Sequence, residues 1–372
     1  MGEAELDAVR AVFESGWLSG AGPTCAAFER DFAATVGVAH ALATSNCGSA
    51  LHLALQVLGV RPGDEVVVAD YTFPATGHSV VWAGATPVFA DVRADIGTVD
   101  PASVESLITP RTVGVIAVDL VGQPADYDDL RAITDRHGLW LVEDAACSAG
   151  AVYRGRPAGS LADLATFSFH GRKGITSGEG GALVGGDTAL MERARALHTY
   201  GIAPALSREG QTTLAVPSFE EAGFNYRMSD VQAAIMRVQL GRLSDLVAAR
   251  TRAADGYAER LSGLEGISLP TVLDDRTHPW QSYLLTAADD IDRDRLVMAL
   301  RERGVGSNFG TYASHLQPVY GATNDCPVSA RLFRTQLALP MHANLDDDDL
   351  DYVAEQLRDV LADPAVRSRG AA

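Results

Sequence analysis

Hydrophobic and polar positions alternate in two ways along the chain, and each way predicts a different element. Short apolar runs of strand length predict six strands, at residues 65–69, 87–91, 113–120, 139–144, 165–170 and 182–185. Between them, apolar residues at helical spacing predict helices at residues 50–58, 101–108 and 127–137. This β/α alternation is typical of a largely parallel sheet that is covered by helices on both faces.

The pattern changes in the last third of the chain. Apolar residues at helical spacing predict one long helix over residues 229–257. Beyond it we expect a strand at residues 281–286, a helix at residues 293–303 and a last helix after Leu345. Four aspartates at residues 346–349 support a helix start there, because acidic side chains favour the positive N-terminal end of a helix.

The length of 372 residues exceeds one ordinary compact core and suits two domains. We therefore predict an α/β fold with a large domain over residues 1–245 and a smaller C-terminal α/β domain over residues 246–372. The large domain holds the mainly parallel sheet, and the long helix leads into the small one.

Charge and cysteine usage narrow the possible partners. The formal net charge of -18, with no block of basic residues, argues against binding to nucleic acid or to an acidic membrane surface. No run of about 18 apolar residues and no basic leader are present, so we expect a cytoplasmic protein. The cysteines are widely spaced, which predicts reduced thiols and neither a metal site nor a disulfide framework; they are Cys25, Cys47, Cys147 and Cys326.

Lys173 is the only lysine, whereas arginine carries every other basic charge. A guanidinium stays protonated, but a primary amine can lose its proton and form a Schiff base with an aldehyde. Lys173 is therefore a candidate for covalent chemistry. Codon bias toward arginine would also leave a single lysine, so its neighbours have to decide between the two interpretations.

Polar residues follow several of the predicted strands, where parallel sheets gather their ligands. Asp144 ends the strand at 139–144, and an acid there could keep a pyridine nitrogen protonated; a helix cap is the alternative. Residues 45–49 precede a helix and could bind a phosphate with their amides, although most such segments only cap the helix. The strand predicted at 165–170 delivers Ser168 and His170 just before Lys173, and Ser168 could donate to the same phosphate. Phe73 could stack on a planar ring or belong to the core.

Motifs along nearly the whole chain resemble the DegT/StrS family of sugar aminotransferases. They lie at residues 48–55, 71–76, 84–89, 122–126, 143–146, 168–181, 224–228 and 232–234. The resemblance implies the fold type I architecture of aspartate aminotransferase, with a mainly parallel mixed sheet in its large domain. It also implies pyridoxal 5'-phosphate as the cofactor and a homodimer whose active sites lie between subunits.

The same resemblance implies roles for individual residues. Lys173 would hold the cofactor covalently, Asp144 would pair with its ring nitrogen, and Phe73 would stack on the ring. Its phosphate would be held by Gly48, Ser49 and Ser168, with Asn225 reaching in from the partner subunit. Four positions depart from the pattern usual in the family: Cys147 replaces a glutamine or histidine near the cofactor hydroxyl, Gly48 replaces a threonine, and Gly310-Thr311 replaces His-Tyr.

Lysine at position 173 resembles the transaminating branch of the family, whereas its dehydratases have histidine there. We expect transfer of an amino group from glutamate or glutamine to a keto sugar, most simply a nucleotide-linked deoxy sugar, in sugar or natural-product biosynthesis. A cyclitol ketone or another secondary-metabolite ketone is the alternative acceptor, and a non-catalytic cofactor-binding regulator is a more distant one. Candidates on the substrate side are His170, Arg172, Tyr312 and His315.

Catalysis also sets a condition on Lys173. The amine has to be neutral near pH 7 to act as nucleophile and to move a proton. Burial beside a cationic ring lowers the pKa of an amine, and we expect the site to use this effect.

Overall fold

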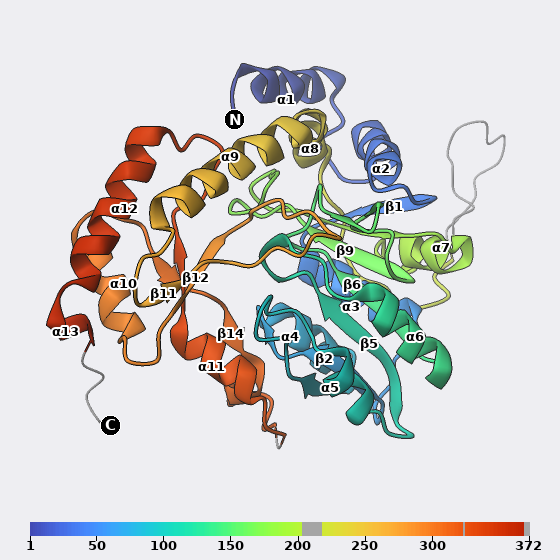
Figure 1. Cartoon of the computed structure of the whole chain (residues 1–372). Coiled ribbons are helices and arrows are strands. Elements are labelled where there is room, and N and C mark those ends of the chain that lie inside the picture. Colours follow the sequence, from blue (N-terminus) through green and yellow to red (C-terminus); the bar gives the residue numbers. More distant parts are fainter. Residues whose placement is uncertain (203–217, 323, 368–372) are drawn as a thin grey trace.

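The computed structural model describes residues 1–202, 218–322 and 324–367, and they form a large α/β body with a smaller lobe beside it (Figure 1). A seven-stranded sheet runs through the body. Its strands in spatial order are β1 (His40–Thr44), β10 (Gly181–Gly185), β9 (Leu164–Ser168), β6 (Trp140–Asp144), β5 (Thr112–Val118), β2 (Glu65–Ala69) and β4 (Thr86–Ala90). The five strands from β9 to β4 are parallel, and β10 is antiparallel to both neighbours. The predicted mainly parallel, mixed sheet is confirmed.

All six predicted strands of the body are present, with ends that differ by a few residues. The strand β1 was not predicted. Its sequence, His-Ala-Leu-Ala-Thr, contains no aromatic residue and only one β-branched one, so local propensity does not favour a strand. Pairing with β10 along its whole length decides its conformation.

Helices cover both faces of the sheet because side chains alternate along each strand. Val66 and Val68 of β2 pack on one face, and Val67 packs on the other. The first face is covered by α3 (Cys47–Val57), α4 (Ala75–Trp82) and α7 (Thr188–Leu197). The second is covered by α5 (Pro101–Ser106), α6 (Tyr127–His137), α2 (Pro23–Val36) and α8 (Asp230–Gly241), with α1 (Glu3–Ser15) lying on α8.

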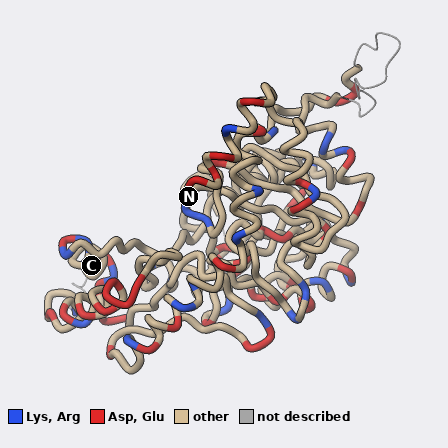
Figure 2. The backbone as a smooth tube through the Cα atoms, turned by 90° about the horizontal axis from the view of Figure 1, so that it is seen from above, with Lys and Arg blue, Asp and Glu red and all other residues tan. Residues whose placement is uncertain are grey.

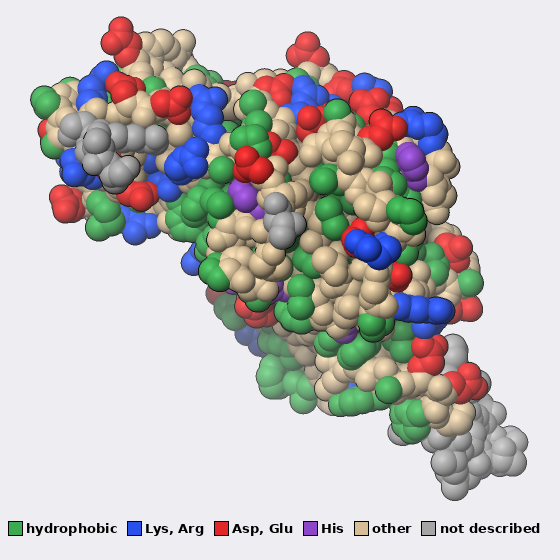
Figure 3. All heavy atoms as spheres, turned by 90° about the horizontal axis from the view of Figure 1, so that it is seen from below, with side chains coloured by type: hydrophobic (Ala, Val, Ile, Leu, Met, Phe, Trp, Pro, Cys, Tyr) green, Lys and Arg blue, Asp and Glu red, His purple; other side chains and the backbone are tan. Residues whose placement is uncertain are grey.

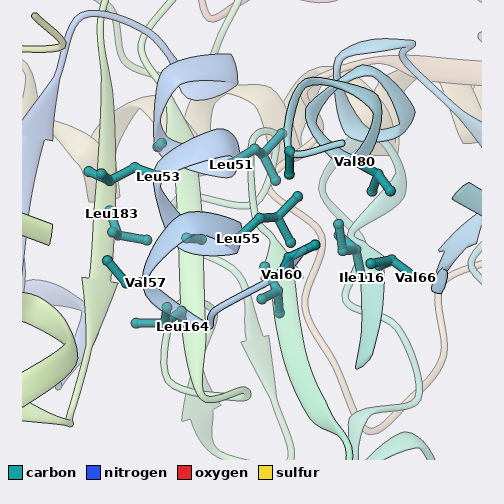
Figure 4. Packing of buried hydrophobic residues seen from close by; sticks show 14 of the residues in the cluster. Leu51, Leu53, Leu55, Val57, Val60, Val66, Val80, Ile116, Leu164 and Leu183 are labelled. Carbon is teal, nitrogen blue, oxygen red and sulfur yellow. The ribbon is translucent and has the colours of Figure 1, made fainter. Parts of the chain in front are cut away.

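The helix α3 is buried along nearly its whole length against this sheet (Figure 4). Leu53 and Val57 lie on the flank toward Leu183, while Leu51 and Leu55 lie toward Val80. Full burial of one such side chain contributes about 1.5–3 kcal/mol. The start of α3 is therefore held rigidly over the sheet, which matters for the site described below.

The smaller lobe contains a second, antiparallel sheet with the order β11 (Ile267–Ser268), β12 (Tyr283–Ala287), β15 (Gln336–Leu339) and β13 (Asn308–Phe309). It shares a separate hydrophobic core with α9 (Leu243–Leu261), α10 (Arg293–Glu302), α12 (Asp347–Leu361) and α13 (Pro364–Arg367). The remaining elements are α11 (Pro327–Thr335), the pair β3 (Tyr71–Thr72) and β14 (Tyr312–Ala313), the pair β7 (Val152–Tyr153) and β8 (Arg156–Pro157), and two 3-10 turns at Leu120–Gly122 and Ser314–Leu316.

The predicted single helix over 229–257 is wrong, because the chain forms α8 and α9 with a break at Arg242. Arg242 has φ -108° and ψ 5°, outside the helical region, and it follows Gly241, a residue type that commonly ends helices. The proposed domain boundary between residues 245 and 246 falls inside α9. The division of the chain at that point stays a prediction.

Charged residues of both signs are interspersed over both lobes (Figure 2). On the face shown in Figure 3, hydrophobic side chains lie in patches between charged ones. Within the described ranges, no helix is both long enough and apolar enough to cross a membrane.

Candidate active site

Asp144 is the last residue of β6 and lies at the carboxyl edge of the parallel strands, opposite Thr166 of β9. Its side chain is almost completely buried. The Thr76 hydroxyl donates to Oδ2 at 2.7 Å, and the backbone amide of Ala146 donates to Oδ1 at 3.2 Å. Burial raises the pKa of Asp144, although both hydrogen bonds and the charge of Lys173 oppose this shift. A cation placed at this carboxylate would therefore be strongly stabilised.

Lys173 lies in the loop between β9 and β10, and its Nζ donates to Sγ of Cys147 at 3.0 Å. The loop is closed by hydrogen bonds from Lys173 N to His170 O and from Gly171 N to Gly178 O. Gly178 has φ 84°, a left-handed conformation that glycine adopts without strain. The fold therefore directs the sole primary side-chain amine toward the end of β6.

The pKa of Lys173 does not follow burial alone. Burial lowers the pKa of the amine, but Cys147, Cys47 and Asp144 raise it by more, so it lies above its ordinary value. The residues of this chain alone thus favour the ammonium form. Without the charges of these neighbours, burial would leave the pKa of Lys173 below its ordinary value.

The N-terminus of α3 is the third component of the site. The helix begins at Cys47, three residues earlier than predicted, so Gly48 and Ser49 belong to its first turn. The Asn46 side chain accepts from Ser49 N at 2.8 Å, and the hydroxyls of Ser45 and Ser49 lie 3.1 Å apart. First-turn amides have no partners within the helix and give its end a partial positive charge, which suits a phosphate.

Gly181 brings this helix end close to β9. A methyl group on Gly181 would lie 2.6 Å from the amide nitrogen of Cys47, so only glycine permits this approach. Gly181 also pairs with Ser168 in the sheet. The structure therefore gathers Gly48, Ser49 and Ser168 at one place, as the sequence predicted, although their contact with a phosphate stays a prediction.

Phe73 is not a core residue, because 64% of its surface is exposed. It lies between β3 and α4, and its carbonyl accepts from Thr76 N at 3.3 Å. Thr76 is the residue that also bonds to Asp144, so the exposed ring and the buried carboxylate belong to one hydrogen-bonded unit. The Tyr312 ring lies edge-on to Phe73 with centroids 6.1 Å apart.

The other predicted substrate residues lie in two different environments. His170 and Arg172 are exposed on the lysine loop, and Nε2 of His170 is 3.7 Å from Glu179. His315 is held by buried Asp70, with Nδ1 2.7 Å from Oδ2 and its backbone amide donating to Oδ1 at 2.6 Å. Asn225 is exposed, and its role toward a partner subunit stays a prediction.

One group of side chains in the described residues could hold a metal ion, formed by Asp70, His315 and Cys326 with ligand atoms within 4.8 Å. The carboxylate of Asp70 and the imidazole of His315 already satisfy each other through their hydrogen bond. We assign no metal to this group.

Sequence reasoning missed Thr76 and Arg250. Thr76 stands in the motif at residues 71–76, but its bond to Asp144 spans 68 positions and has no local signal. Arg250 lines a pocket with Lys173, Cys147 and Ser168. Nothing in the sequence distinguishes it from the other arginines.

The residues present fit pyridoxal phosphate. An amine on Lys173, a buried acid at Asp144, an uncovered ring on Phe73 and an anion-binding helix end lie around one edge of the sheet. A Cβ atom on Gly181 would clash with the start of α3. The backbone at Gly181 is therefore packed closely against this helix end, which brings the helix end into the site. These are the four features that the cofactor needs for covalent attachment, ring protonation, stacking and phosphate binding.

Solved structures share this fold and chemistry. An aminotransferase TlmJ from Streptoalloteichus hindustanus superimposes with a TM-score of 0.91 at 35% identity, covering 97% of both chains. A putative sugar aminotransferase from Streptococcus pneumoniae in its PLP-form gives a TM-score of 0.90 at 26% identity, covering 97% of this chain and 96% of that one. The fold and the site define an aminotransferase that uses pyridoxal phosphate.

Sequence comparison places this enzyme more narrowly. The family model described as the DegT/DnrJ/EryC1/StrS aminotransferase family matches residues 1–358, and the chain belongs to that family. GDP-perosamine synthase from Caulobacter vibrioides is 38% identical over 96% of this chain and 95% of its own. The spore coat polysaccharide biosynthesis protein SpsC of Bacillus subtilis is 35% identical over 97% of this chain and 95% of its own. The predicted family, fold class, enzyme class and cofactor are confirmed.

Proposed function

We propose that this enzyme transfers an amino group from glutamate or glutamine to the keto group of a nucleotide-linked deoxy sugar. The contact of Lys173 Nζ with Cys147 beside Asp144 supports the amino-transfer chemistry most directly, since it puts the only lysine at the acid end of the sheet. The acceptor class is supported by similarity to a relative whose name denotes a synthase of a GDP-linked sugar.

Lys173 and Asp144 have different roles toward the cofactor. When bound, pyridoxal phosphate supplies an aldehyde carbon that takes up the amino group and a ring that accepts electrons. Lys173 would hold the cofactor covalently, and its freed amine would take the proton from the α-carbon of the donor and return it later. Asp144, held by Thr76 and Ala146, keeps a proton on the ring nitrogen. A protonated ring beside Asp144 would oppose the smallest of the contributions, after those of Cys147 and Cys47, that raise the pKa of Lys173.

The other residues position the cofactor. Gly48 and Ser49 offer first-turn groups of α3 to the phosphate, and Ser168 offers a hydroxyl from β9. Phe73 would cover one face of the ring. Cys147 stands beside Lys173, at the position where the resemblance implies a glutamine or histidine near the cofactor hydroxyl, and a thiol would take that place here.

An acceptor without a nucleotide, such as a cyclitol ketone, is the second candidate. The Gly310-Thr311 pair supports it, because the resemblance implies His-Tyr there in many relatives. A methyl group on Gly310 would lie 2.4 Å from the Tyr71 hydroxyl and 3.0 Å from Cβ of Gln336, so packing excludes a histidine at position 310.

Mass spectrometry of ketone panels tests the function. The purified enzyme, loaded with cofactor, is incubated with glutamate or glutamine and with nucleotide-linked keto sugars or cyclitol ketones. We expect one nucleotide-linked keto sugar to gain an amino group, and amination of cyclitols alone would establish the second candidate. Lys173→Arg is the control, because a guanidinium cannot form the covalent link, and it should lose both turnover and the visible absorbance of the bound cofactor. Turnover by that variant would refute the role of Lys173, and a wild-type enzyme that accepts an amino group but aminates no ketone would favour the regulator.

A further inference from the structure

Arg250 differs from the other buried arginines of the described chain, which are Arg276 and Arg293. Arg276 is paired with Asp126 and Asp275, and Arg293 bonds to Asp294 and to the carbonyl of Gln336. Arg250 is only 8% exposed, and its Nε has no hydrogen-bond partner. Among residues 1–202, 218–322 and 324–367, no carboxylate pairs with it.

An unpaired cation in such a place is costly. Guanidinium groups stay protonated, so the chain cannot avoid this cost by neutralising the side chain. Burial alone shifts the pKa of Arg250, and it lowers it, since no acidic neighbour opposes the shift. Buried charges are normally paired or hydrogen-bonded, so an unpaired one is a candidate position for a ligand that supplies the opposite charge.

The guanidinium lies next to the reactive lysine. A methyl group on Gly174, the residue after Lys173, would lie only 3.1 Å from Nη1 of Arg250. Arg250 lines one pocket together with Lys173, Cys147 and Ser168, and the rest of its wall is mainly apolar, with Leu246, Val247, Ile175 and Pro279. An anionic oxygen that reaches this small pocket would lie close to both the arginine and the lysine loop.

We propose that Arg250 binds the α-carboxylate of the amino donor. This inference rests on the proposed function, in which Lys173 takes a proton from the donor's α-carbon. The α-carboxylate is attached directly to that carbon, so it must lie close to Lys173. Apart from Lys173, which would be linked to the cofactor, Arg250 is the only charged residue of this wall, so it matches the charge of one carboxylate, and its planar fork matches the geometry of the carboxylate oxygens. A nucleotide diphosphate carries more negative charge than this wall can balance.

Calorimetry with glutarate tests the binding itself, without any reaction. Glutarate keeps the two carboxylates of glutamate but has no amino group, so it can bind to the cofactor-loaded enzyme without turnover. We expect Arg250→Met to bind glutarate at least about tenfold more weakly, and Arg250→Lys to retain part of the affinity because the charge remains. Arg252→Met is the matched control, since Arg252 is an exposed arginine on the same helix, and it should bind glutarate like the wild type.

Two further measurements distinguish donor binding by Arg250 from a structural role and from nucleotide binding. The melting temperature of Arg250→Met should equal or exceed that of the wild type, because the variant removes an unpaired buried charge. Affinity for GDP should be the same in both proteins. Glutarate affinity within twofold of the wild type in Arg250→Met would overturn the inference, and so would a loss of GDP binding with glutarate binding retained.

The donor inference and the proposed function can fail separately. If the wild type aminates a ketone and Arg250→Met does so with unchanged dependence on glutamate concentration, the donor site is wrong and the function stands. If the wild type aminates no ketone, the function fails whatever Arg250 binds.

Discussion

The hydroxyl of Thr76 donates a hydrogen bond of 2.7 Å to Oδ2 of Asp144, and so joins the turn that exposes Phe73 to the carboxylate at the end of β6. Both residues are buried, and the sequence around each of them gives no sign that they are in contact. The bond favours the ionised form of Asp144, which is the form that can hold a proton on a bound ring.

Thr76→Val should weaken cofactor binding by about tenfold, since a hydrogen bond to a charged group contributes about 1.5–3 kcal/mol. The variant also removes an interaction that lowers the pKa of Asp144, so that pKa rises further. Cofactor affinity should therefore begin to fall at a higher pH in the variant than in the wild type as the solution is acidified. Absorbance titrations with cofactor at several pH values measure both effects. Thr76→Ser keeps the hydroxyl and should resemble the wild type; equal affinity and pH dependence in Thr76→Val would contradict the assignment.

Mixing two inactive variants tests whether active sites are shared between subunits. Asn225 is exposed, and the resemblance implies that it reaches a neighbouring site, whereas Lys173 serves the site of its own chain. In a homodimer, Lys173→Arg and Asn225→Ala should each be inactive. Unfolding and refolding them together should restore about a quarter of wild-type activity, because half of the dimers are mixed and each has one intact site. No recovery in a preparation that light scattering shows to contain dimers would argue against shared sites.

Buried histidines should make the fold sensitive to acid. Burial lowers the pKa of His278 to about 3 and that of His198 to about 4, whereas an unfolded histidine titrates near 6.5. The unfolded chain therefore binds more protons below pH 6.5, and stability is lost as the pH falls from there toward 4 and then 3. Between pH 6.5 and 5 each histidine should cost about 2 kcal/mol of unfolding free energy.

His278→Asn isolates one of these contributions. Nδ1 of His278 accepts from the Trp280 amide at 2.9 Å, and an asparagine oxygen can replace that acceptor without a titrating ring. The midpoint of urea unfolding should decrease less between pH 7 and pH 5 in this variant than in the wild type. His137→Asn, which changes an exposed histidine, serves as the control. An identical pH response of His278→Asn and wild type would show that His278 does not stay neutral in the folded chain.

Gly310 is where this chain departs from the His-Tyr of its family, and the structure explains glycine by packing. Gly310→Ala should destabilise the protein by about 1–3 kcal/mol, because its methyl group would overlap the hydroxyl of fully buried Tyr71. Gly306→Ala is the matched control, since no atom lies within 4 Å of a methyl group there. Thermal unfolding of both variants tests this explanation. A Gly310→Ala protein as stable as Gly306→Ala would mean that the packing around Tyr71 and Gln336 can accept a side chain at this position.

Much of the architecture follows from local patterns. The strands β2 and β6 and the helix α6 are short elements with clear periodicity, and their predicted bounds agree with the structure to within one residue. The order of these elements, together with the positions of Lys173 and Asp144, was enough to predict a parallel sheet with an amine and an acid at one edge. The geometry of a parallel sheet brings together the residues that directly follow its strands. Local sequence patterns are therefore enough to predict that these residues lie near one another.

Contacts between segments that are distant in the sequence could not be predicted from local sequence patterns. The strand β1 exists because β10 pairs with it. The break at Arg242 separates α8, which packs on the core of the body, from α9, which begins on that core and ends on the core of the smaller lobe. The bond of Thr76 to Asp144 and the burial of Arg250 likewise require the chain to be folded, because burial and pairing across 68 or more positions are properties of the packed whole. The sequence by itself determined which chemical groups are available and along which strands they lie. Only the tertiary structure decided which of them are desolvated, which are paired, and which buried cation in the described residues has no acidic partner.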